Sequence, residues 1–298
     1  MRIACLQIRA TRMLVLVLAL VITPLARAQN PDTMNPDQNM AKAKQLLKQS
    51  IAGMGGVHFE NSTGNQCSGR VAQFDHNGTM AGYTSMRSYW EYPDKNRLEY
   101  EVKSTKGGIF AVLVGSLPIK GGLLIQLFAG DKGWSMDKGG VEEAPVTAIS
   151  DFQMAMKRQI HNILTVRAKE DGVFLRFGGS GIVDMRQVDW VEMSDQDGSN
   201  LVRVALDHST HVPWRTVVKT ANEDMNQMDE DVTIYSNYEE LQGVQTPMQV
   251  SREHNGHRSY QIFYDSCQNN PSLPADFYTK ESLDKTYAEK GGKKKDKK

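Results

Sequence analysis

Alternating apolar and polar residues dominate the second half of the 298-residue chain. Between residues 200 and 278 one extended segment follows another, and no stretch there has the period of a helix. In the segment 201–207, for example, Val202, Val204 and Leu206 alternate with polar or small neighbours. Such alternation, bounded by Gly, Pro, Asn and Asp, is typical of antiparallel strands with one buried face.

The same pattern predicts strands along most of the chain. Asn-Gly pairs favour tight hairpins and occur at Asn77-Gly78 and Asn255-Gly256. The sequence GGSG at 178–181 predicts a further turn. The expected strands cover residues 67–74, 79–92, 97–104, 171–177, 182–193, 201–207, 214–220, 232–238, 246–253 and 257–265.

Two longer segments have the caps and the period of amphipathic helices. The first begins at Asn35, which a proline follows, and ends at the pair Gly55-Gly56. The second spans residues 150–164, where Ser150 opens a capping box. A third, short helix is expected over 280–290. The apolar face of each long helix must lie against another element, and the sheet is the candidate.

One segment, residues 107–130, departs from the alternation. It reads GGIFAVLVGSLPIKGGLLIQLFAG, and both 109–114 and 123–128 are apolar on two sides. Its glycines, proline and lysine argue against a membrane helix. The segment is expected to form two short buried strands or an apolar lid. Core packing is the plainer interpretation, and contact with a ligand or a partner is the alternative.

The N-terminus of the chain predicts export. Arginines precede an apolar run of ten residues, 13–22, and Ala26-Arg27-Ala28 follows as a cleavage site, so residues 1–28 are expected to be a signal peptide. A retained anchor is the alternative, although the run is shorter than the roughly 20 residues that a membrane helix needs. The expected location is the periplasm of a Gram-negative-type bacterium, with cleavage near Ala28.

The remaining chain is expected to comprise a flexible segment at 29–38, one domain at 39–288 and a lysine-rich disordered tail at 289–298. The full chain has 35 basic and 35 acidic residues. Without the signal peptide and the tail from Lys290 onward, 25 basic residues stand against 34 acidic ones. This acidic body argues against nucleic acid as a partner. The tail is expected to be solvated, and peripheral contact with an anionic membrane is the alternative.

Two cysteines remain after the expected cleavage, Cys67 and Cys267. They stand near the first and the last of the predicted strands. An exported chain meets an oxidising environment, so the two could form a disulfide that ties the ends of the sheet together. The sequence leaves pairing and free thiols equally open.

Signals for catalysis, metals or cofactors are weak. The histidine pairs at 208–211 and 254–257 lack the further ligands that zinc requires. The carboxylates of Asp184, Asp189 and Glu192 fall on both faces of one predicted strand. No Gly-x-Ser-x-Gly sequence is present. We therefore expect no catalytic residues, no metal, no cofactor and no enzyme activity.

The pattern as a whole predicts a mainly β (α+β) fold. A large antiparallel sheet curls, and a few amphipathic helices would cover its concave face, giving an incomplete β-barrel. Such an arrangement leaves an apolar cavity between the sheet and the helices. The residues expected to line it are Trp90, Ile109, Phe110, Val112, Val114, Leu123, Ile125, Leu127 and Trp134.

Several short sequences, in this order, resemble one known family. They are MGG at 54–56, YPDKNR at 92–97, GDKGW at 130–134, LDHSTHVPWRTVVK at 206–219, YSNYEELQGVQTPMQV at 235–250 and SLPADFY at 272–278. Together they resemble exported bacterial proteins of the outer-membrane lipoprotein-sorting (LolA-like) family over residues 41–278. The resemblance implies an incomplete antiparallel barrel, plugged by helices, that shelters acyl chains.

The expected function is therefore that of a periplasmic carrier or chaperone. It would bind a hydrophobic ligand, such as a lipid or a lipoprotein acyl chain, in the cavity of the half-barrel without covalent chemistry. The alternative is an envelope interaction or sensor module that uses the same fold to bind a protein partner.

Overall fold

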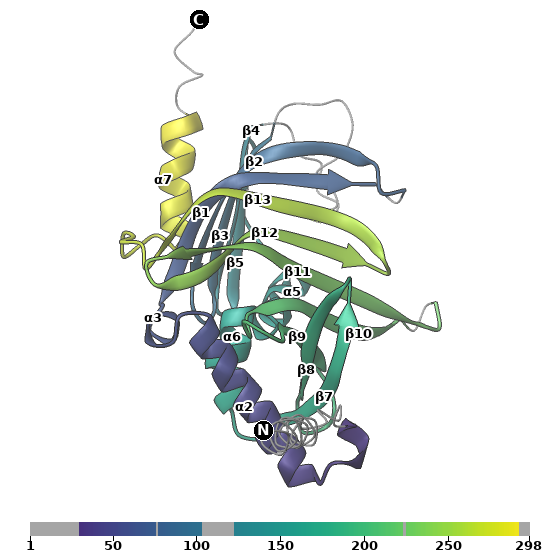
Figure 1. The fold of residues 1–298 in the computed structure, drawn as a ribbon. Coiled ribbons are helices and arrows are strands. Elements are labelled where there is room, and N and C mark those ends of the chain that lie inside the picture. The colour runs from purple at the N-terminus through teal and green to yellow at the C-terminus, as the bar shows by residue number, and fades with distance from the viewer. Residues whose placement is uncertain (1–29, 76, 103–121, 223–224, 292–298) are drawn as a thin grey trace, which may run out of the picture.

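A computed structural model describes residues 30–75, 77–102, 122–222 and 225–291. Its 13 strands form one antiparallel sheet in the order β6-β5-β4-β3-β2-β1-β13-β12-β11-β10-β9-β8-β7 (Figure 1). The strands are β1 (Gly64–Phe74), β2 (Met80–Glu91), β3 (Lys95–Val102), β4 (Gly122–Ala129), β5 (Lys132–Asp137), β6 (Gly140–Glu143), β7 (Phe174–Val183), β8 (Arg186–Ser194), β9 (Val202–Asp207), β10 (Pro213–Asn222), β11 (Gln227–Leu241), β12 (Val244–His254) and β13 (His257–Asn269). The helices are α2 (Pro36–Gly53), α3 (Val57–Glu60), α5 (Val146–Lys157), α6 (Ile160–Thr165) and α7 (Lys280–Gly291), with 3-10 turns η1 (Pro31–Thr33) and η2 (Arg167–Lys169).

The sheet consists of two meanders that meet at one seam. Within β1–β6 and within β7–β13, every strand pairs with its neighbour in the sequence. Among the described strands, β1 and β13 are the one pair that are not sequence neighbours, and they pair from Asn65↔Asn269 to Gln73↔Tyr260. We call this β1–β13 pairing the seam. Strands β6 and β7 are left at the two edges, so the sheet is curved but not closed.

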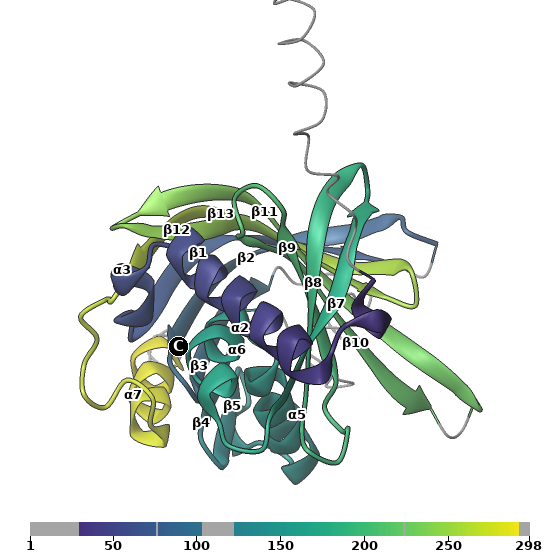
Figure 2. The same ribbon diagram turned by 60° about the horizontal axis from the view of Figure 1, so that its bottom comes forward.

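The helices divide between the two faces of the sheet. Figure 2 shows the sheet arching over α2, α5 and α6, and we call this covered side the inner face. Buried residues of α2 and α6 form the main core there with β7, β8 and β9. Helix α7 packs on the opposite, outer face, where Leu283 is buried against Ile125 and Leu127.

Helix α2 is held at its end by close contacts with two turns. A Cβ added to Gly53 would lie 2.4 Å from the Thr210 carbonyl oxygen, and one on Gly55 would lie 2.1 Å from that of Gly243. The Met54 carbonyl also accepts a hydrogen bond of 2.9 Å from the Gln245 backbone N–H. Glycine is therefore needed at these positions, which explains part of the MGG sequence in physical terms.

At the other end of α2, Asn39 pairs with the open edge of β7. Its Oδ1 accepts a hydrogen bond of 2.7 Å from the Phe177 N–H, and its Nδ2 donates one of 3.1 Å to the Phe177 carbonyl. One amide side chain thus replaces a missing neighbouring strand. Buried backbone N–H and C=O groups of an edge strand need hydrogen-bond partners. An edge that is covered in this way is also protected from pairing with a strand of another molecule.

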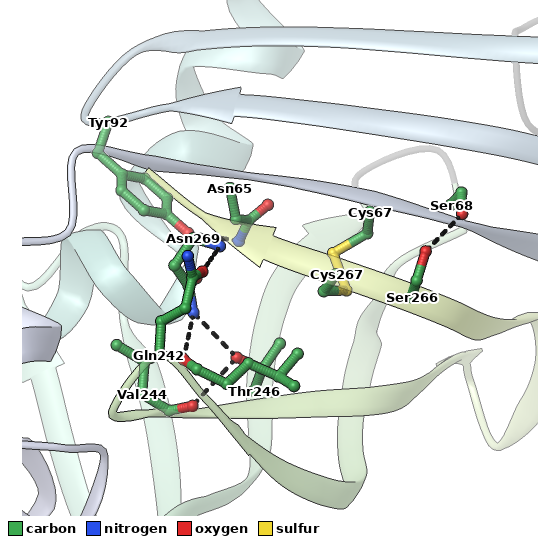
Figure 3. The surroundings of a disulfide bond; sticks show 11 residues. Asn65, Cys67, Ser68, Tyr92, Gln242, Val244, Thr246, Ser266, Cys267 and Asn269 are labelled. Atoms are coloured by element: carbon green, nitrogen blue, oxygen red, sulfur yellow. Dashed lines mark hydrogen bonds between the residues drawn. A yellow bond between two sulfur atoms is a disulfide. The ribbon is translucent and has the colours of Figure 1, made fainter. Parts of the chain in front are cut away.

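A disulfide crosses the seam. Cys67 and Cys267 are in register on β1 and β13 and are bonded to each other (Figure 3). Near them, Asn269 Nδ2 donates to the Leu241 carbonyl at 2.9 Å, and Asn65 Nδ2 donates to the Tyr92 hydroxyl at 2.9 Å. The bond that the sequence left open is formed in this structure, and it joins residues 200 positions apart.

Two predictions of local structure are wrong. The helix expected over 150–164 is two helices, because Gln159 has an extended backbone and its side chain caps α6 by accepting from the Asn162 N–H. The first of them, α5, begins at Val146 instead of at the expected cap, Ser150. The turn expected at 178–181 lies within β7, whose pairing with β8 shifts between Phe177 and Gly179. The other predicted strands and helices in the described residues are present, with ends that differ by a few residues.

Replacing Asn39 with leucine tests the edge contact. The Asn39→Leu variant leaves the buried N–H and carbonyl of Phe177 without partners, so unfolding should become easier by about 1–3 kcal/mol. Urea denaturation followed by circular dichroism measures the difference. Gln38→Leu, at the exposed neighbouring position, is the matched control and should change stability by less than about 0.5 kcal/mol. Equal stability of the two variants would contradict the role given to Asn39.

Reduction tests the seam bond. Since the bridge closes a loop of 200 residues, its loss should lower the free energy of unfolding by about 3–5 kcal/mol. The measurement is the urea midpoint with and without a phosphine reductant. The double variant Cys67→Ala, Cys267→Ala should match the reduced protein and should not respond to the reductant. A reductant effect of the same size in that variant would assign the loss to something other than the bridge.

Candidate functional site

The inner face of the sheet is the candidate site, and strand register defines its residues. Val71 on β1, Met86 on β2, Tyr100 on β3 and Leu124 on β4 form one buried cluster on this face. Phe128 lies four residues after Leu124 on β4 and therefore on the same face of that strand. Its ring stacks on Phe152 of α5 with ring centroids 4.7 Å apart. The inner face is therefore apolar in the first meander, and helix α5 covers part of it.

Two neighbouring rows of residues continue this face across the seam. Register aligns Val71, Ile262, Val250 and Tyr235 on β1, β13, β12 and β11, and we call them the apolar row. A second row lies two residues from the first on each strand, toward the β12–β13 turn. We call it the polar row, and its members are Gln73, Tyr260, Arg252 and Thr233. In the apolar row, Val71 is buried, whereas Ile262, Val250 and Tyr235 are only partly buried.

Two tyrosines of the inner face combine desolvation with remaining exposure. Burial raises the pKa of both Tyr235 and Tyr264 to about 12, in part offset by hydrogen bonds with Thr216 and Ser88. Both residues nevertheless keep accessible surface. They are neutral near neutral pH, and each presents a ring with one polar atom, a combination suited to contacts with amphiphilic molecules.

A buried histidine fixes helix α6 beneath the sheet. His161 stacks on Tyr92 with ring centroids 3.8 Å apart and contacts Phe59 at 5.0 Å. Its Nε2 lies 3.3 Å from the Phe59 carbonyl oxygen, and its Nδ1 lies 3.2 Å from the Thr165 hydroxyl. Burial lowers the pKa of His161 to about 4. The ring is therefore neutral when the protein is folded near neutral pH.

The structure places the residues that the sequence proposed for the cavity in three groups. Trp90 shares the inner face with Met86, by strand parity. Four others, Leu123, Ile125, Leu127 and Trp134, belong to the cluster that packs under α7 on the outer face. The remaining four, Ile109, Phe110, Val112 and Val114, lie outside the described residues. Contact of the nine with a ligand stays a prediction, and the geometry gives the α7 group a packing role.

Sequence reasoning missed the polar row and its surroundings. The Asn255-Gly256 turn predicts that β12 and β13 are neighbours, but a register shift between Arg252 and Glu253 decides that Arg252 lies opposite Tyr260. Alternation alone could not supply that shift. The signal that was present is the pair of tyrosines, Tyr260 and Tyr264, in one predicted strand, at the spacing of one face.

The described residues give no arrangement that suggests catalysis. Asp189 is buried and accepts a hydrogen bond from the Ser180 hydroxyl, and its other oxygen lies 2.8 Å from His208 Nδ1. The carboxylate stands between the hydroxyl and the imidazole, so the histidine does not contact the serine as a general base would. Within the described ranges, no three His, Cys, Asp or Glu residues gather as metal ligands. Nor is any helix of this part of the chain long and apolar enough to cross a membrane.

Comparison with solved structures identifies the fold. A DUF1329 family protein from Desulfovibrio piger superposes with a TM-score of 0.54 at 12% identity, over 82% of this chain and 99% of that one. A LolA superfamily protein from Nitrosomonas europaea gives 0.50 at 11% identity, over 81% and 99%. The fold is LolA-like. No protein-family model and no curated protein sequence matches the chain. At these identities the likeness establishes the LolA-like fold alone, and it confirms the resemblance and the fold class expected from the sequence.

The buried histidine of this LolA-like fold predicts an acid-sensitive stability. The unfolded chain protonates His161 near its ordinary pKa of 6.5, whereas the folded protein resists protonation down to about 4. Its contribution is complete above pH 6.5 and is lost as the pH falls toward 4, by up to about 1.4 kcal/mol per pH unit. The check is urea denaturation between these limits. As the pH falls, the free energy of unfolding of the wild type should decrease relative to that of His161→Phe. The control is His257→Asn, at an exposed position, whose difference in unfolding free energy from the wild type should stay the same.

Proposed function

We propose that this protein is an exported carrier or chaperone that holds a hydrophobic ligand, such as a lipid or a lipoprotein acyl chain, on the inner face of its half-barrel. The observation that carries the proposal is the state of Tyr235 and Tyr264. Their raised pKa values mean that protein surrounds them, and their remaining accessible surface means that something small can still reach them. Residues with both properties are expected to line a recess.

The chemistry of the inner face suits an alkyl chain. Half-buried Ile262 and Val250 lie side by side across β13 and β12, with Leu98 and Val102 packed against the neighbouring cluster. Each CH₂ group that leaves water contributes about 0.8 kcal/mol, so a chain of ordinary length would more than offset the cost of being held still. The LolA-like fold supports this choice, because the implied use of that fold is to shelter acyl chains.

The proposed setting follows from the sequence. Cleavage near Ala28 would release the protein into the periplasm of a Gram-negative-type bacterium. A carrier of this kind performs no covalent step. The lysine-rich tail at 289–298 would add a weak attraction to an anionic membrane surface.

A second candidate function is an envelope interaction or sensor module. It is favoured by exposed methionines at two hairpins: Met80 at the start of β2, Met225 between β10 and β11, and Met228 near the start of β11. By register, both hairpin turns lie at the same end of the sheet. Methionine is over-represented at binding surfaces that accommodate several partners.

A tryptophan in the apolar row separates the two functions. Val250→Trp would place a ring where the alkyl chain is proposed to lie, so the variant should carry much less lipid. The measurement is native mass spectrometry of residues 29–298 purified from the periplasm, followed by solvent extraction. Phe263→Trp changes a partly exposed residue on the outer face and should carry as much lipid as the wild type.

The same samples can overturn the proposal. If the wild type gives only its own mass and takes up neither added fatty acid nor lipopeptide, the carrier function is wrong. The partner-binding module would then be the better account. Thermal unfolding of both tryptophan variants shows that a loss of lipid in Val250→Trp does not come from loss of the fold.

A further inference from the structure

The polar row contains more hydrogen-bonding capacity than the described residues satisfy. Gln73 is only 3% exposed, and both polar atoms of its side chain are buried without a hydrogen-bond partner among the residues that the structure describes. It lies opposite Tyr260, which in turn lies opposite Arg252. A buried amide without partners is destabilising, so an unpaired Gln73 is expected to persist where a ligand supplies the missing partner.

A second group, Arg158, stands near the polar row, where its charge is met by no direct ion pair with a described residue. It follows the last residue of α5, and its Nε is buried without a hydrogen-bond partner in the described ranges. Within the described part of the chain its side chain forms no ion pair, although Asp231 and Arg252 both act on it electrostatically. Burial lowers the pKa of the Arg158 guanidinium, as expected for a cation that is removed from water.

The charges around this end of the inner face do not balance. Asp231 Oδ2 lies 3.3 Å from Arg252 Nη2, and Asp231 Oδ1 lies 3.1 Å from His254 Nδ1. One carboxylate therefore faces the guanidinium groups of both Arg252 and Arg158, and it forms an ion pair with Arg252 alone. An anion here would meet a guanidinium, the Gln73 amide and the Tyr260 hydroxyl, which are all able to donate hydrogen bonds to it.

We propose that the polar row and Arg158 form a site for the anionic head group, a carboxylate or a phosphate, of an amphiphilic ligand. This inference rests on the proposed function and deepens it by naming the class of cargo. The apolar row is the next row along the same strands, so the alkyl chain of such a ligand would lie over Val250 and Ile262 and continue toward Tyr100 and Leu124. The ligand would thus be oriented, with its head at the hairpin ends of β12 and β13.

The experiment compares two ligands that differ only in the head group. Dodecanoate and dodecanol compete against the neutral dye N-phenyl-1-naphthylamine for the delipidated protein at about pH 8, where the carboxylate is ionised. The wild type should prefer dodecanoate by at least about tenfold. Arg158→Gln should remove most of this preference by weakening dodecanoate alone, and Arg158→Lys, which keeps the charge, should restore part of it.

Two further variants make the test specific. Gln73→Leu should weaken dodecanoate about threefold or more and leave dodecanol unchanged, because only the carboxylate uses the amide. Arg70→Gln removes an arginine from β1 that is exposed and paired with Asp265, and it should change neither ligand. The urea midpoint of each variant shows that it is folded.

Each alternative result has its own meaning. Equal affinity for dodecanoate and dodecanol in both the wild type and Arg158→Gln would overturn the head-group site and leave the carrier standing. Competition by acetate as strong as that by dodecanoate would show a site for small anions and would overturn the amphiphile. Failure of the dye and of both ligands to bind would overturn the carrier and the head-group site together.

Discussion

The pairing of β1 with β13 is the contact on which the rest of the structure depends. Every other strand pair within the described sheet joins sequence neighbours, and all of these except β3 and β4 are linked by only a few residues. The seam alone unites two meanders whose paired residues are about 200 positions apart, at a large cost in chain entropy. The apolar row crosses the seam, so without it the inner face would not exist as one surface. Gly69 shows how close the approach is, because a Cβ there would lie 2.1 Å from the Phe263 carbonyl oxygen.

Helix α2 is the second element that holds the curved sheet together. It lies across the second meander, with Leu46 and Leu47 in the main core, and it touches two turns through Gly53 and Gly55. Its far end saturates the edge of β7 through Asn39. A single helix thus shields an edge, fills the concave side and ties the turns of β9–β10 and β11–β12 to each other. The remaining inner face, toward β12 and β13, is the part on which polar and half-buried residues remain.

The sequence predicted the strands well because one face of most of them is buried, and burial imposes the period of two that alternation detects. It failed where local pattern and long-range geometry differ. The apolar period continues from Phe152 to Ile163, yet the chain bends at Gln159 so that α5 can reach Phe128 while α6 reaches α2. For Ile125 and Leu127, the pattern showed burial but not which face would be buried, because α7 comes from the far end of the chain. The candidate head-group residues depend on a register shift that no turn sequence specifies.

The positions of the two cysteines in the sequence determine when the disulfide can form. Cys67 is synthesised long before Cys267, and if the chain is cleaved after Ala28, as the sequence predicts, each cysteine has the other as its sole partner. Such a chain has no alternative intramolecular bridge, so formation of the native disulfide requires no thiol–disulfide rearrangement within it. The disulfide can therefore form only after residue 267 has been synthesised, so a chain truncated before that residue cannot be cross-linked.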